Sequence, residues 1–162
     1  MRTRALTAAL VLAAACALSG CTGGSSGSRH TLYDSIDALA ADSSAIVVGE
    51  VARQRTEGET TISSVVVGSA PTNPQLGAEV DGGASAIESG DVVDVRQTTS
   101  PYLEVGGRYA LFLTPTMLEG DAASQFYVTG AEAGIYACEA DSCHRVALDS
   151  GDDLPETIEL AG

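Results

Sequence analysis

Apolar residues recur with helical spacing in one short segment after residue 30. Leu32, Ile36 and Leu39 lie at positions i, i+4 and i+7, which places them on one face of a helix. Thr31 can cap the start of such a helix with its hydroxyl. The pattern therefore predicts a helix over 31–42 whose apolar face packs against the core of the domain.

Beyond this segment the pattern changes to β-rich runs that are separated by turn residues. Gly49 lies in the middle of the first run, where a glycine often marks a bulge or a tight bend of a barrel strand. The predicted strands cover 45–53, 60–68, 91–98, the segment 101–115 with a turn at Gly106-Gly107, 125–130, 134–138 and 143–148.

The fourth of these runs has apolar residues on both faces. Tyr109, Leu111 and Leu113 lie on one face, and they alternate with Ala110 and Phe112 on the other. A strand of this kind is covered on both sides, so we expect it at the centre of the fold. One helix followed by six or seven short strands predicts a mainly β domain, either a small antiparallel barrel or a sandwich.

Two segments do not fit this pattern of short connections. The stretch near 69–90 is rich in glycine and proline and is too long for an ordinary turn, so we expect a flexible insertion there. The C-terminal tail over 149–162 is acidic, and we expect it to end in a turn of helix after Pro155.

The N-terminus has the layout of an export signal. Two arginines precede an uncharged apolar run that is short for a membrane span. The tetrapeptide Leu18-Ser19-Gly20-Cys21 resembles the lipobox of bacterial lipoproteins, which implies cleavage before Cys21 and diacylation of its thiol. An ordinary secretory signal is the alternative. We therefore divide the chain into a signal peptide (1–20), a Gly/Ser-rich tether (21–30) and one folded domain (31–162).

Charge limits the partners that this domain can take. The chain has 8 basic and 22 acidic residues, for a formal net charge of −14. Such a charge repels phosphate backbones, so we expect no nucleic-acid partner. It also repels an anionic lipid surface, so membrane contact should come from the acyl chains on Cys21 alone.

Cys138, Cys143 and His144 form the most reactive stretch of the sequence. Export places the two cysteines in an oxidising compartment, and a hairpin between them would bring them within disulfide range. A zinc site would need a fourth ligand, and neighbouring residues in a strand point to opposite faces. We predict a disulfide between Cys138 and Cys143, with no metal or cofactor. A metal carrier or a redox protein that uses all three residues is the alternative.

Catalytic motifs are missing from the sequence. It contains no Gly-x-Ser-x-Gly elbow and no His-Glu-x-x-His, and His144 is its only histidine beyond the tether region. We therefore assign no catalytic residues and expect a protein that is not an enzyme. The expected class is a non-catalytic binding or accessory module on the cell surface, with a surface or secreted protein as its partner.

Three motifs resemble a group of secreted and lipid-anchored proteins of GC-rich Gram-positive bacteria. They are SSAIVVGEV at 43–51, LEVGGRYALFL at 103–113 and FYVTGAEAGIY at 126–136. More distantly, the layout is similar to the OB-like barrel of the netrin and tissue-inhibitor-of-metalloproteinase domains. Those inhibitors chelate zinc through a free N-terminal cysteine, whereas Cys21 resembles a lipidated residue on a tether. The resemblance therefore implies an OB-like barrel but not an inhibitory role.

The predicted core of this barrel and its helix combines residues from both kinds of element. Its members are Leu32, Ile36, Leu39, Ile46, Val48, Val66, Val93, Val95, Tyr109, Leu111, Leu113 and Ile135.

The lipid anchor can be tested by replacing its thiol. We expect Cys21→Ser to be released into the medium or to stay uncleaved, because serine offers no sulfur for acylation. Cell fractionation with immunoblotting measures both outcomes. Mature, membrane-bound Cys21→Ser protein would contradict the lipobox interpretation.

Overall fold

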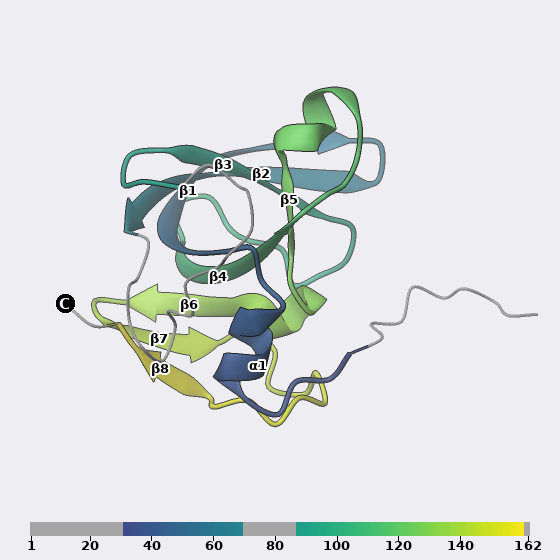
Figure 1. Ribbon diagram of the computed structural model, residues 1–162. Helices are drawn as coiled ribbons and strands as arrows, with labels where there is room; N and C mark the ends of the chain where they lie inside the picture. The colour runs from purple at the N-terminus through teal and green to yellow at the C-terminus, as the bar shows by residue number, and fades with distance from the viewer. Residues whose placement is uncertain (1–30, 70–86, 161–162) are drawn as a thin grey trace, which may run out of the picture.

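Five strands close into a barrel, and a smaller layer packs against one side of it (Figure 1). The computed structural model describes residues 31–69 and 87–160. The predicted signal peptide, the tether, Cys21 and most of the predicted insertion lie outside the described residues. The elements are α1 (Ile36–Ala41), β1 (Ala45–Glu57), β2 (Thr60–Ser69), β3 (Val92–Gln97), β4 (Arg108–Pro115), η1 (Gly120–Ser124), β5 (Phe126–Val128), η2 (Ala131–Gly134), β6 (Ile135–Glu139), β7 (Ser142–Arg145) and β8 (Thr157–Glu159).

The barrel is closed by the ring β1-β2-β3-β5-β4, in which β4 pairs again with β1. All of these pairs are antiparallel except β3 with β5, which is parallel. The predicted barrel is therefore confirmed, but it is mixed rather than purely antiparallel. The reason is geometric: a closed ring with an odd number of strands cannot alternate in direction throughout, so one pair must be parallel.

β1 bends so that it can pair with strands on both of its sides. Its first half pairs with β4, and the register with β2 shifts between Val48 and Gly49. A Cβ atom at Gly49 would lie 2.5 Å from the carbonyl oxygen of Val66, a distance that no side chain tolerates. The bend that the sequence predicted at Gly49 is confirmed, and close backbone approach explains the glycine.

β4 contributes to two separate cores. Tyr109, Leu111 and Leu113 point into the barrel, where they pack with valines of β1, β2 and β3. Ala110 and Phe112 point outward into a second core beneath α1 and β6–β8. The prediction of a central strand with two apolar faces is confirmed.

The second core joins the two ends of the described domain. The rings of Phe112 and Tyr136 lie 6.2 Å apart between centroids. Burial raises the pKa of Tyr136 to about 12, and its hydroxyl donates to the carbonyl of Pro155 at 3.1 Å. The phenol therefore stays protonated and holds the C-terminal segment against β6.

The helix is shorter than its predicted span. Ser35, rather than Thr31, caps it by accepting from the amide of Ala38. The backbone of Tyr33 is used elsewhere: its amide donates to Asp152 Oδ1 at 2.8 Å, and its carbonyl accepts from Asp153 at 2.9 Å. These contacts with the C-terminal segment keep the residues before Ser35 out of the helix.

Most of the predicted core is buried, with three exceptions. Leu32 is 64% exposed because it precedes the helix, and Val66 is 38% exposed because it points outward from β2. Ile36 is only partly buried and packs on the edge of the second core. The other predicted members are confirmed as core residues.

The C-terminal tail forms a strand where a turn of helix was predicted. β8 pairs with β7, so that Ile158 lies opposite Cys143. Both side chains enter the second core, and this burial decides the conformation of the tail. Among the described residues, no helix is long and apolar enough to cross a membrane.

The burial of Leu111 gives a direct test of the barrel. Leu111 is fully buried, so we expect Leu111→Ala to lower the free energy of unfolding by about 2–5 kcal/mol. Leu32→Ala is the matched control, and its exposed side chain should cost less than about 0.5 kcal/mol. Urea unfolding of both variants measures the two effects. Equal losses would show that the barrel interior has been misplaced.

Candidate functional site

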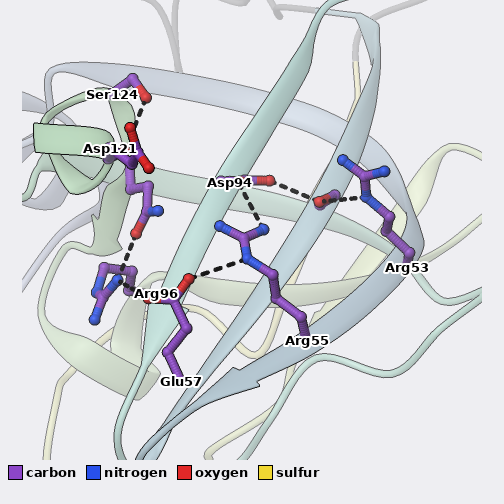
Figure 2. Close-up of polar contacts among 9 residues, drawn as sticks. Arg53, Arg55, Glu57, Asp94, Arg96, Asp121 and Ser124 are labelled. Carbon is purple, nitrogen blue, oxygen red and sulfur yellow. Dashed lines mark hydrogen bonds and ion pairs between the residues drawn. The ribbon is translucent and has the colours of Figure 1, made fainter.

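Arginines and carboxylates gather on the outer face of β1, β2 and β3 (Figure 2). A second register shift in β1, between Val51 and Arg53, reverses which residues point outward. Val51 therefore faces the barrel core, whereas Arg53 and Arg55 lie on the outer face. We call this surface the arginine face and define it by Arg53, Arg55, Glu57, Ser64, Asp94, Arg96 and Gln125.

Asp94 is at the centre of the arginine face. It accepts from Ser64 Oγ at 2.6 Å through Oδ1 and from Arg55 Nη1 at 2.8 Å through Oδ2. Arg53 Nε donates to the same serine hydroxyl at 3.1 Å. Both arginines are therefore held in place by strands other than their own.

Arg96 connects this network to the chain segment that precedes β5. Its Nη1 donates to Gln125 Oε1 at 2.7 Å and to Glu57 Oε2 at 3.2 Å. Glu57 also pairs with Arg55 Nε at 3.2 Å. The turn between β1 and β2 and the connection between β4 and β5 thus meet at Arg96.

Ile62 lies beneath the arginine face and is fully buried. It pairs with Arg55 on one side and with Arg96 on the other, and it belongs to neither core. The register places Ile62 between the two arginines on the same face of the sheet, where the aliphatic parts of long basic side chains commonly cover apolar neighbours. The arginines therefore have a packing role as well as a charge.

The network keeps its carboxylates ionised. Partial burial acts to raise the pKa of Asp94, but the hydrogen bonds from Ser64 and Arg55 outweigh it and hold that pKa below its usual value. Hydrogen bonds from Arg55 and then Arg96 lower the pKa of Glu57. The hydrogen bond to Asp94 correspondingly raises the pKa of Arg55, although burial opposes it.

The arginine face still has hydrogen-bond donors to offer. Within the described residues, the two Nη groups of Arg53 meet no acceptor, and Arg55 uses only Nε and Nη1. The face carries three arginines and two carboxylates, a local formal charge of +1 in a chain of −14. A planar guanidinium with free donors suits an acidic oxygen on a ligand.

The predicted disulfide between Cys138 and Cys143 is present. The two residues are paired directly across β6 and β7, with an S–S distance of 2.02 Å and a Cα–Cα distance of 3.9 Å. The turn between the strands contains two residues, Ala140 and Asp141, rather than the predicted four, because the pairing extends one step beyond the cysteines. The bond closes a short loop, which is consistent with a stabilisation of about 2 kcal/mol.

His144 is not brought together with the cysteine sulfurs. Its side chain is exposed, whereas Cys143 is buried in the second core. Its Nδ1 lies 3.0 Å from Thr157 Oγ1 on β8. In the described part of the chain, no three His, Cys, Asp or Glu residues are grouped closely enough to hold a metal ion. The disulfide also removes both thiolates that a metal carrier would need.

Sequence reasoning missed the arginine face. The alternation of Arg53, Arg55 and Glu57 is visible in the sequence, but the predicted first strand ends at Arg53 and leaves Arg55 and Glu57 in the turn before the second strand. Asp94 and Arg96 share the same two-residue spacing in the third strand. This paired spacing is the signal that could have predicted a charged face.

Comparison of the chain with models of known protein families, with curated proteins and with solved structures found no match.

The lowered pKa of Asp94 predicts a pH-dependent contribution to stability. At neutral pH we expect Asp94→Asn to lower the free energy of unfolding by up to about 1 kcal/mol, because the ion pair is partly solvated. The stabilising effect of the charge is present above the unfolded pKa and is lost as pH falls through the lowered folded pKa. The difference between variant and wild type should therefore shrink in acid.

Urea unfolding between neutral and acidic pH measures this difference. Asp121→Asn is the control, since its carboxylate makes no hydrogen bond or ion pair within the described residues. A difference for Asp94→Asn that does not change with pH would contradict the assigned role.

Proposed function

We propose that this protein is a lipid-anchored binding module that works on the extracytoplasmic face of a bacterial cell membrane. The observation that carries the binding role is the arginine face, where three arginines gather in a strongly acidic chain. Its surface presents guanidinium donors, whereas the hydroxyl of Ser64, which donates to Asp94, is buried and already engaged by Arg53. The chemistry supports binding rather than catalysis.

We further propose that the barrel is OB-like and related to the netrin and tissue-inhibitor-of-metalloproteinase domains. The strand order β1-β2-β3-β5-β4 with closure onto β1 supports this, as does the parallel β3–β5 pair. OB-folds bind ligands on the face of their second and third strands, between the loops after the first and fourth strands. The arginine face lies on this surface, and Arg96 contacts both loop regions through Glu57 and Gln125.

The ligand that this face suits best is an acidic segment of a surface or secreted protein. Free guanidinium nitrogens on Arg53 and Arg55 can donate to a carboxylate. Nucleic acid is disfavoured, because the −14 charge of the whole chain would repel its backbone. Exposed Val66 and Val92 lie beside the charged residues on the same strands, and they provide apolar contact area.

The anchor would hold this face near the membrane. Acylation of Cys21 supplies two lipid chains, which suffice for stable attachment. The Gly/Ser-rich segment that follows has an expected reach of about 15 Å. The domain could then turn freely while remaining close to the cell surface.

Photo-crosslinking on living cells tests the binding role. A photoreactive residue is placed in the full chain at Val66, beside the arginine face, or at Val146, beyond β7. Both valines are 38% exposed, so they are matched for access. We expect a discrete crosslinked protein from position 66 alone. Arg53→Gln in the same chain should reduce its yield several-fold.

Equal crosslinking from both positions would contradict the proposed binding face. So would a yield at position 66 that Arg53→Gln leaves unchanged.

A further inference from the structure

A hollow of about 230 Å³ opens beside the parallel seam of the barrel. β3 and β5 pair only through Val95 with Phe126 and Arg96 with Tyr127, and then the two chains diverge. The connection that follows β3 forms one wall, and η2 forms the other. The lining residues are Arg96, Gln97, Thr98, Thr99, Ser100, Pro101, Tyr127, Val128, Ala131, Glu132 and Ile135.

The wall after β3 is fixed in shape by Gln97. The side chain of Gln97 is buried, and its Nε2 donates to the carbonyl of Pro101 at 2.8 Å. Its Oε1 accepts from the amide of Leu103 at 3.1 Å. Both ends of the amide thus clamp the segment 98–101, and a pre-shaped wall lowers the entropy cost of binding.

The hollow combines an apolar floor with a polar rim. Val128 and Ile135 are buried at its base, and Tyr127 is half-buried at its side. The side-chain hydroxyls of Thr98, Thr99 and Ser100 stand along the rim, and none of them has a hydrogen-bond partner within residues 31–69 and 87–160. Small-molecule sites have this composition, an apolar lining with a few convergent polar groups.

Arg96 is shared between the hollow and the arginine face. Its Nη1 is engaged by Glu57 and Gln125, and its Nε is closed off from solvent, so neither nitrogen is open to a ligand in the hollow.

The charges around the hollow favour a neutral ligand. Glu57 already offsets the charge of Arg96, and Glu132 adds a negative charge to the lining. An anionic ligand would therefore gain little electrostatic binding energy in the hollow, and the −14 charge of the chain would repel such a ligand. The volume is below the range of about 300–1,000 Å³ that is usual for drug-sized ligands, which limits the ligand to a single small ring.

We propose that this hollow binds one neutral, polyhydroxylated ring, such as a single sugar residue of a glycan. The hydroxyls of Thr98, Thr99 and Ser100 would exchange hydrogen bonds with the ring hydroxyls, and Tyr127 would contact its apolar face. This site shares Arg96 with the arginine face, but the proposal does not depend on the function proposed for that face.

Titration of the full chain with glucose and with N-acetylglucosamine tests the site, with ligand-observed NMR as the readout. Acetate is the anionic comparator, and cyclohexanol is a ring with a single hydroxyl. We expect saturable binding of at least one sugar, with a Kd of about 1 mM or weaker. Acetate and cyclohexanol should each bind at least about tenfold more weakly than that sugar.

Variants assign the binding to the hollow. Thr99→Val combined with Ser100→Ala removes two rim hydroxyls on an exposed segment, and we expect it to weaken sugar binding about tenfold. Thr31→Val, an exposed threonine outside the hollow, should bind as the wild type does.

Several outcomes would overturn the proposal. They are the absence of saturable binding by both sugars, equal binding of acetate or cyclohexanol, and unchanged binding in the Thr99→Val, Ser100→Ala chain. Arg53→Gln separates this proposal from the function proposed above, because it should impair crosslinking at the arginine face while leaving sugar binding intact.

Discussion

The architecture depends on the double pairing of β1, which joins β4 through its first half and β2 through its second. The strand pairs with both neighbours at Val48, Gly49 and Glu50, and its backbone there approaches β2 more closely than a side chain at Gly49 would allow. Once β1 closes the ring, five strands must include one parallel pair. That pair, β3 with β5, is two residues long, and the hollow beside it exists because the chains diverge so soon.

A second register shift in the same strand produces the charged surface. Without the extra residue between Val51 and Arg53, the alternation of β1 would turn its arginines toward the barrel interior. The shift places them outside, where Arg53 donates to Ser64 on the neighbouring β2 and Arg55 donates to Asp94 on β3, one strand further across the sheet. Barrel closure and the arginine face are therefore consequences of two irregularities in one strand.

The outer layer depends on β4 and on contacts between distant parts of the chain. Because both faces of β4 are apolar, the barrel needs a cover on that side, which α1 and β6–β8 supply. Asp152 fixes the backbone of Tyr33, and Arg145 donates to the carbonyl of Asp152 at 3.2 Å. The disulfide between Cys138 and Cys143 is part of this cover, with Cys143 buried in the second core. It is a structural bond within the layer that supports the barrel.

The sequence by itself determined the features that depend on local pattern and on residue type. Alternating apolar residues located β4, and the glycine located the bend of β1. Two cysteines in a chain with a predicted export signal indicated their bond. The tertiary structure decided whatever depends on residues far apart in sequence. Leu32 lies outside the core because Asp152 binds the backbone of Tyr33. The tail forms β8 because Ile158 is buried opposite Cys143. The arginine face depends on the register of three strands. Such contacts leave no local pattern, since their free energy arises only when the distant segments meet.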